Sequence, residues 1–179
     1  MSRVTIKDKT FETSIPEAEI QKRVKAVADR INSDFQGRVP VLLSVLNGSF
    51  VFAADLMRYL NIECEISFVK MASYEGTSST GKVRKLIGVN TDLKGRDVII
   101  VEDIVDTGVT MKNMLGMLKE YEPASLHICT LLVKPEKLTV PLNIEDCARE
   151  IPNAFIVGYG LDYDQLGRNL RDIYTVVED

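Results

Sequence analysis

Apolar residues along this chain fall into short continuous runs and into stripes at helical spacing. The runs Val41–Leu46 and Val98–Val101 are almost wholly apolar, which is typical of strands buried on both faces at the centre of a parallel sheet. Apolar stripes predict three helices, over residues 16–32, 50–60 and 111–121. We therefore expect an α/β chain with parallel strands in its core.

Alternating and shorter apolar segments predict the remaining strands. The spacing of Ser14–Glu17 is that of a capping box for the first helix. We expect residues 141–152 to be irregular. Because the chain has no internal repeat, low-complexity tract or linker, we expect a single domain over residues 1–179. The expected segments are an edge strand or arm over 5–11 and strands over 62–71, 83–89, 126–133, 155–160 and 173–177.

An acidic and hydroxyl-rich segment, Glu102–Thr110, follows the second apolar run. We expect the strand to stop at Glu102 and Asp103, and a helix to begin near Met111. Backbone N–H groups and threonine hydroxyls at the start of a helix form a cradle for phosphate. Carboxylates beside a phosphate repel it unless a bound Mg²⁺ or the hydroxyls of a sugar intervene. An isolated Asp-Thr-Gly would more simply be a turn with solvated acids.

Three other segments are candidates for a site, and each has a plain structural alternative. Asn47–Ser49 closes the first apolar run; alone it would be an ordinary strand-to-helix turn, but two such loops at the carboxyl ends of parallel strands can share one crevice. Ser73–Gly81 has Tyr74 as its one apolar anchor, so it is either a lid or a simple hairpin connection. Lys134 follows a strand directly, where a lysine is usually solvated.

The thirteen residues Val98–Thr110 resemble the phosphoribosyl-pyrophosphate (PRPP) motif of the type I phosphoribosyltransferases. Both have four apolar residues, two acidic residues, two apolar residues, and then Asp-Thr-Gly with a further threonine. From Val41 to Val177 the chain is similar to bacterial hypoxanthine or hypoxanthine-guanine phosphoribosyltransferases. The segments that carry this narrower resemblance are Leu46–Phe50, Ser73–Tyr74, Val133–Pro135 and Phe155–Arg168, in that order.

The resemblance implies a fold and a reaction. The fold is a mainly parallel, twisted sheet flanked by helices, with a small hood drawn from the N-terminal arm and the region after about residue 134. In the reaction a purine ring nitrogen attacks C1 of PRPP and expels pyrophosphate, giving IMP from hypoxanthine or GMP from guanine. The implied cofactor is Mg²⁺, and the implied assembly is a homodimer or homotetramer.

The resemblance also implies roles for individual residues. Asp106 would accept the proton at the purine N7, and Glu102, Asp103 and Asp162 would lie near metal. The family commonly has a lysine or arginine where this chain has Asn47, so a side-chain cation at the pyrophosphate is missing. The substrate contacts would be Leu46, Asn47, Gly48 and Arg168 at the pyrophosphate, Asp106, Thr107, Gly108, Val109 and Thr110 at the 5′-phosphate, Glu102 and Asp103 at the ribose, Ser73 and Tyr74 in the lid, and Lys134 and Phe155 at the purine, together with Ile104, Ile156 and Asp162.

Composition and charge narrow the range of possible partners, structural sites and locations for the protein. A net charge of −4 offers no general attraction to nucleic acid or to an anionic membrane, and 45% hydrophobic and 27% charged residues are ordinary for a globular protein. Three scattered cysteines and one histidine argue against a disulfide framework or a structural zinc site, and no apolar run approaches the ~20 residues of a membrane span. We expect a cytoplasmic protein.

Three rival hypotheses remain at this point. The first is an enzyme of the same superfamily that uses xanthine or uracil. The second is a regulator that senses PRPP, which should carry a basic face or an added DNA-binding domain, and the third is a non-catalytic α/β binding module.

Overall fold

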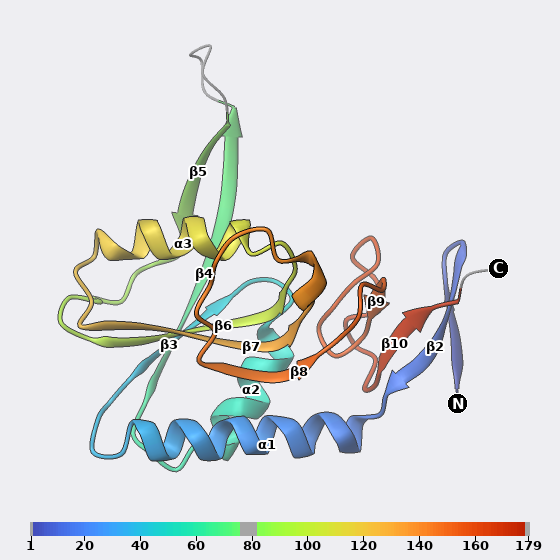
Figure 1. Cartoon of the computed structure of the whole chain (residues 1–179), viewed down its shortest axis with the longest axis horizontal. Coiled ribbons are helices and arrows are strands. Elements are labelled where there is room, and N and C mark those ends of the chain that lie inside the picture. The colour runs from blue at the N-terminus through green and yellow to red at the C-terminus, as the bar shows by residue number, and fades with distance from the viewer. Residues whose placement is uncertain (1, 76–81, 178–179) are drawn as a thin grey trace.

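The computed structural model describes residues 2–75 and 82–177, without the side chains of 73–75 and 82–85. Within these residues the chain forms two sheets and three α-helices (Figure 1). No described helix is both long and apolar enough to cross a membrane. The elements are β1 (Arg3–Ile6), β2 (Lys9–Ile15), α1 (Glu17–Asp34), β3 (Val41–Val45), α2 (Phe50–Tyr59), β4 (Glu65–Glu75), β5 (Lys82–Ile87), β6 (Asp97–Val105), α3 (Val109–Lys119), β7 (Ser125–Val133), a 3₁₀ turn (Pro135–Lys137), β8 (Asp146–Glu150), β9 (Ile156–Val157) and β10 (Ile173–Val176).

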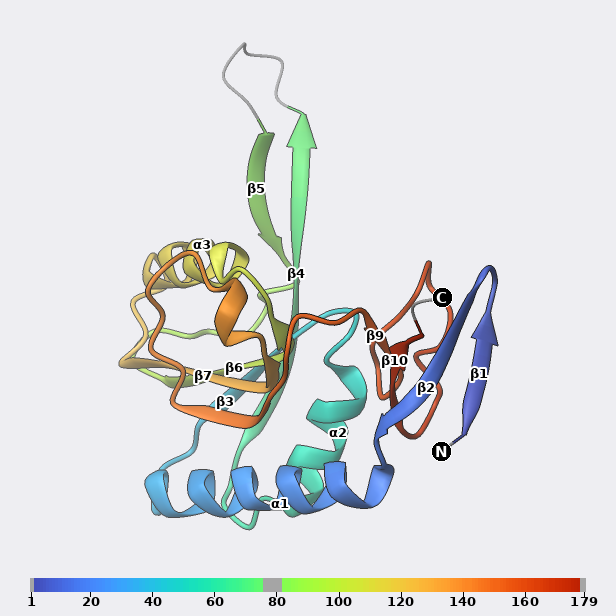
Figure 2. The same ribbon diagram turned by 45° about the vertical axis from the view of Figure 1, so that its right-hand side comes forward.

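The larger sheet has the strand order β5-β4-β3-β6-β7-β8. All neighbouring strands pair in parallel except β5, which runs antiparallel to β4. Helices α1 and α2 lie on one face of this sheet and α3 lies on the other, while the β4–β5 hairpin projects beyond the sheet (Figures 1 and 2). The predicted mainly parallel sheet flanked by helices is confirmed.

Alternating residues of the central strands supply the two cores on either side of the large sheet. Leu42 lies opposite Ile99, and both side chains pack with those of α1 and α2. Their neighbours Leu43 and Ile100 turn to the other face and pack with those of α3. Each of these side chains is almost wholly buried, which contributes about 2 kcal/mol per residue to stability. Burial on both faces therefore explains the continuous apolar runs.

The smaller sheet is antiparallel, has the order β1-β2-β10-β9 and carries both ends of the described chain (Figure 2). Its own small core contains Phe11, Val157 and Tyr174. The arm expected over residues 5–11 is in fact a hairpin, because the chain turns at Lys7 and Asp8 between β1 and β2. The region after Lys134 contributes to both sheets, since β8 extends the larger one.

Several expected boundaries are wrong for identifiable reasons. Strand β6 does not stop at Glu102 but continues to Val105, because it keeps pairing with β7 over its last residues. Helix α3 begins at Val109 rather than near Met111. Residues 141–152, expected to be irregular, include β8, which forms only because β7 offers it a parallel edge.

The expected capping box at the start of α1 is also wrong. Pro16 is the residue before the helix, and the Ser14 hydroxyl donates instead to the carbonyl oxygen of Ile173. The Glu17 N–H donates to Asp172 Oδ1 at 2.8 Å, so a residue from the far end of the chain caps this helix. Such a partner is invisible in the local sequence.

Helix α2 offers a matched pair of phenylalanines. Phe52 is wholly buried between α2 and the sheet, whereas Phe50, two positions earlier, is 44% exposed. Phe52→Ala should lower the free energy of unfolding by about 3–5 kcal/mol because it leaves a cavity, and Phe50→Ala should cost less than about 1 kcal/mol. Denaturant titration of both variants measures the difference. Equal losses would contradict the assigned faces of α2.

Candidate active site

The carboxyl ends of β3, β6 and β7 meet at one edge of the larger sheet, which is where ligands bind in open α/β folds. Val105 lies opposite Val133 in the parallel register, so the two residues that follow them, Asp106 and Lys134, are neighbours. The Lys134 N–H donates to the Val105 carbonyl oxygen at 3.1 Å. Parallel pairing therefore brings together two candidate residues that are separated in sequence.

Thr107 and Gly108 form the turn into α3. Gly108 has a φ of 83°, which favours glycine, and a Cβ there would lie 2.8 Å from Leu142 Cδ1, so that side chain would have to shift. The Val109 N–H lies 3.4 Å from Thr107 Oγ1, and Thr110 begins the helix. A cavity of about 160 Å³ opens over this turn. The positive end of α3 and these hydroxyl groups give it the character of an anion site.

Asp106 has two differently placed oxygen atoms. Oδ2 accepts a hydrogen bond from Lys137 Nζ at 3.1 Å. Oδ1 is buried and has no hydrogen-bond partner within the described part of the chain. Burying an acceptor without a partner is costly, so this atom is placed to meet a donor on a ligand. Lys137 was not among the residues expected from the sequence, and the 3₁₀ turn after Lys134 carries it back toward Asp106.

Glu102 and Asp103 are adjacent carboxylates near the end of β6. The Asp103 N–H donates to Glu102 Oε1 at 3.1 Å, and the Ile104 N–H donates to Asp103 Oδ1 at 2.7 Å. Burial, and then the charge of Asp103, raises the pKa of Glu102 well above its usual range. Burial also raises the pKa of Asp103, against the hydrogen bonds that it accepts and the positive charge of Arg168. Two carboxylates so placed favour either a shared proton or a cation.

Gly48 is the point where three distant segments touch. A Cβ on Gly48 would lie 1.7 Å from Asp103 Oδ2, so the carboxylate occupies the space that a side chain would need. Gly160 has a φ of 98°, and a Cβ there would lie 2.3 Å from the Gly48 carbonyl oxygen. The loop after β3, the acidic end of β6 and the turn after β9 are therefore in direct contact.

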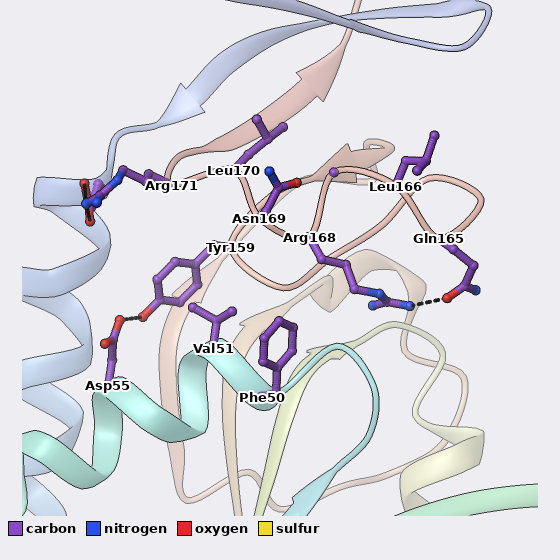
Figure 3. Close-up of a pocket in the computed structure, with 12 residues that line it drawn as sticks. Phe50, Val51, Asp55, Tyr159, Gln165, Leu166, Arg168, Asn169, Leu170 and Arg171 are labelled. Carbon is purple, nitrogen blue, oxygen red and sulfur yellow. Dashed lines mark hydrogen bonds and ion pairs between the residues drawn. The ribbon is translucent and has the colours of Figure 1, made fainter.

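Arg168 returns to the same place from the C-terminal segment. Its Nη1 donates to the Gly160 carbonyl oxygen at 2.8 Å, and its Nη2 lies 3.1 Å from Asp162 Oδ1. Figure 3 shows that the Arg168 side chain reaches toward Gln165, whose Oε1 lies 3.3 Å from Nη2. Asp162 Oδ2 in turn accepts the Gln165 N–H at 2.8 Å. Arg168 is thus held beside Gly160 and Gly48, while Asp162 is engaged in an ion pair.

The residues expected to contact the purine are only partly brought together. Lys134 is 8% exposed, unlike the usual solvated lysine at a strand end. Phe155 is 43% exposed, and its ring centroid lies 5.5 Å from that of Tyr163 and 5.9 Å from that of Phe11. Ile156 packs its side chain into the core, so only its backbone is free to meet a ligand. Ile104 also packs against that core.

The remaining candidates lie at the ends of β3 and β4. Asn47 is exposed, and the peptide between Leu46 and Asn47 is cis. Ser73 and Tyr74 belong to β4, where they pair with β5, so the loop expected from Ser73 onward begins later than the sequence indicated. The rest of the expected lid, residues 76–81, lies outside the described residues.

Glu102 and Asp103 are the best candidates to hold a metal ion. Among the described residues no group of three or more His, Cys, Asp or Glu side chains could enclose one. Mg²⁺ keeps several waters and is commonly held by one or two carboxylates plus the oxygens of a substrate. Two adjacent oxygen donors with raised pKa values fit such a shared ion, since a cation would offset the cost of burying their charge.

Comparison with known proteins places this site in a family. Residues 16–164 match the phosphoribosyl transferase domain family. The hypoxanthine-guanine phosphoribosyltransferase of Streptococcus pneumoniae is 41% identical over 162 residues, 90% of each chain, and the hypoxanthine phosphoribosyltransferase of Escherichia coli is 42% identical over 171 residues, 94% of this chain and 96% of that protein.

A solved structure agrees with the sequence relatives. The crystal structure of a hypoxanthine-guanine phosphoribosyltransferase from Bacillus anthracis matches with a TM-score of 0.86 at 41% identity, covering 93% of this chain and 98% of that one. The match confirms the type I phosphoribosyltransferase fold that the sequence predicted. Sequence and structure therefore agree that this chain belongs to the phosphoribosyl transferase domain family and is a transferase.

Proposed function

We propose that the chain transfers the 5-phosphoribosyl group from PRPP to hypoxanthine, and also to guanine, giving IMP or GMP and pyrophosphate. The observation that carries the proposal is the contact of Gly48 with Asp103 and Gly160, which gathers an acidic pair, a backbone loop and an arginine at one edge of the sheet. The names of the relatives, at about 40% identity over most of the chain, support the same reaction.

The geometry suggests how each part of PRPP would bind. The 5′-phosphate would occupy the cavity at the start of α3, where Thr107 and Thr110 lie beside backbone N–H groups. The pyrophosphate would lie between the loop at Gly48 and the guanidinium of Arg168. Asn47 brings no charge to this side, so the protein groups that bind the anion would be Arg168 and the backbone amides.

Glu102 and Asp103 would meet the ribose hydroxyls and share a Mg²⁺ ion with the substrate. When bound, this ion would neutralise charge that develops on the departing pyrophosphate. Asp162 would contribute to a second ion only by loosening its ion pair with Arg168. The proposed magnesium requirement thus depends chiefly on the acidic pair.

Asp106 would accept the proton from the purine N7 as the bond between the ring nitrogen and C1 forms. Its buried Oδ1 has no partner among the described residues, while Lys137 holds Oδ2 at 3.1 Å, so the carboxylate presents one oxygen atom to a ligand. Lys134 follows β7 directly and lies beside Asp106, and it would donate to the 6-oxo group of the purine. The exposed ring of Phe155 would stack on the base.

We further propose that the chain acts as one domain over residues 1–179 and as a homodimer or homotetramer. A cytoplasmic location is consistent with Cys64, Cys129 and Cys147, all of which are free thiols. Gel filtration with light scattering would measure the assembly.

Asp106→Asn removes the proton acceptor with little change in shape. The turnover number for hypoxanthine should fall by about 10²- to 10⁴-fold, and the KM for PRPP should change far less, because the cradle and the acidic pair remain. Steady-state kinetics in both substrates measure the two effects. Asp92→Asn, in an exposed loop, is the matched control. Near-normal turnover in Asp106→Asn would remove the assignment.

The proposed function is tested by pyrophosphate release with PRPP, Mg²⁺ and a panel of hypoxanthine, guanine, xanthine, adenine and uracil. Hypoxanthine should be used and adenine should be a very poor substrate, because the Lys134 ammonium has only donors and the adenine amine at position 6 is also a donor. Lys134→Gln should reduce the use of hypoxanthine by at least about tenfold and leave the KM for PRPP nearly unchanged.

Phe155→Ala serves as the matched comparison for Lys134→Gln. It should weaken the binding of every purine by about 1–3 kcal/mol and leave the order of preference among the purines unchanged. Release with xanthine or uracil but not with hypoxanthine would favour a different enzyme of the superfamily. Release with none of the bases would contradict an enzymatic role. Equal use of adenine and hypoxanthine would refute the account of base recognition.

A further inference from the structure

A hydrogen-bonded chain links both helices of one face to the turn after β9. The Tyr159 hydroxyl donates to Asp55 Oδ2 at 2.5 Å, and Gln21 Nε2 donates to the same oxygen at 2.7 Å. The Tyr59 hydroxyl donates to Gln21 Oε1 at 2.8 Å. Gln21 belongs to α1 and Asp55 to α2, so the Tyr159 side chain anchors a third segment directly onto α2 (Figure 3) and, through Asp55, onto α1.

The anchor is buried and stays a hydrogen-bond donor. Tyr159 is 3% exposed, and burial together with the Asp55 carboxylate raises the pKa of its phenol far above the usual range. A phenol that donates to a carboxylate makes a strong, charge-assisted bond. None of the roles assigned to PRPP or purine contacts uses this residue.

The backbone around Tyr159 is unusual and needs support. Its φ is 50°, between values of 99° at Gly158 and 98° at Gly160. A residue with a side chain in this region costs about 1–2 kcal/mol, which surrounding contacts have to offset. The Tyr159 N–H donates to the Leu170 carbonyl oxygen at 2.8 Å, and the Gly160 N–H donates to that of Arg168 at 3.0 Å.

This turn is one side of the proposed pyrophosphate site. Gly160 packs on the Gly48 carbonyl oxygen, and its own carbonyl oxygen holds the Arg168 guanidinium at 2.8 Å. Helix α2 begins at Phe50, directly after the loop that contains Gly48, and it carries Asp55. The same helix therefore holds Gly48 through the backbone that joins them, and it holds Gly160 through the hydrogen bond between Asp55 and Tyr159.

We propose that Tyr159 is a positioning residue for the pyrophosphate of PRPP, acting through Gly160 and Arg168. This inference rests on the proposed function, because it assigns the pyrophosphate to the space between Gly48 and Arg168. The cavity of about 540 Å³ beside the anchor is lined by Tyr159, Asp55 and Arg168 among others, and it leaves the turn without packing on that side. The hydrogen bond to Asp55 therefore ties the turn to α2, and through Gly160 it supports the Arg168 guanidinium in addition to that side chain's own contacts with Asp162 and Gln165.

Tyr159→Phe removes the hydroxyl and keeps the ring. The KM for PRPP should rise by about 5- to 10-fold, while the KM for hypoxanthine should stay within about twofold, because the purine contacts lie elsewhere. In the reverse reaction the KM for pyrophosphate should rise by a similar factor and that for IMP should not. A role limited to packing would lower thermal stability without this selectivity. An active variant with unchanged KM values for PRPP and pyrophosphate would overturn the proposal.

Asp55→Asn is the second variant, and it decides the question if Tyr159→Phe does not fold. It keeps an acceptor for the phenol but removes the charge, so the KM for PRPP should rise above the wild-type value, though by less than in Tyr159→Phe, and an unchanged KM for PRPP in a folded Asp55→Asn protein would overturn the proposal. Both changes act on the bond between Tyr159 and Asp55, although Asp55→Asn also alters the bond from Gln21, so the KM for PRPP of the double variant should rise by less than the product of the two single effects. Additive effects would overturn the proposal.

Tyr121→Phe is the matched control, because Tyr121 is 40% exposed beyond the C-terminal end of α3. Its kinetics should equal those of the wild type. A wild-type protein that releases no pyrophosphate with hypoxanthine would refute the proposed function itself. An active wild type with an unaffected Tyr159→Phe variant would refute only the positioning role.

Discussion

The contact at Gly48 is the constraint on which the rest of the site depends. The Asp103 carboxylate fills the space where a Gly48 side chain would be, and Gly160 packs against the Gly48 carbonyl oxygen. Each contact requires a glycine on at least one side, because any Cβ would overlap an oxygen atom. Loops that are more than fifty residues apart thereby meet without intervening side chains, and a polyanion bound beside this contact can be reached by backbone amides as well as by Arg168.

The charged and polar groups at the site are arranged so that a bound ligand would neutralise them or form hydrogen bonds with them. Burial raises the pKa values of Glu102 and Asp103, so these carboxylates are costly to keep ionised without a cation. Glu102 also lines the cavity at the start of α3, where the positive end of the helix favours an anion. Lys137 satisfies one oxygen of Asp106 and leaves the other without a partner among the described residues. A substrate that carries phosphates, a bound cation and a donor to Asp106 would satisfy all three groups together.

The sequence predicted those features whose signal is local. The buried runs of β3 and β6 and the stripes of the helices appear as simple periodicities, and the acidic loop resembles a known motif over thirteen residues. Features made by distant partners were missed or wrong, such as the end of β6, strand β8 and the cap that Asp172 gives to α1. Lys137 and Tyr159 could not be selected because their partners become neighbours only in the fold. The sequence Lys134–Lys137, with a proline directly after the strand, indicates a turn, and such a turn can bring Lys137 back toward the end of the neighbouring strand.

The most direct test of this account is the substitution Gly48→Ala, measured by PRPP-dependent pyrophosphate release with hypoxanthine as the base. The new Cβ would lie 1.7 Å from Asp103 Oδ2, so the loop and the carboxylate have to move apart. Gly116→Ala is the control, since a Cβ there meets nothing within 4 Å in the interior of α3. We expect Gly48→Ala to remain folded and to lose at least about 100-fold in kcat/KM for PRPP, because a shift of about 1 Å misplaces the reacting groups. Wild-type kinetics in a folded Gly48→Ala protein would contradict the account.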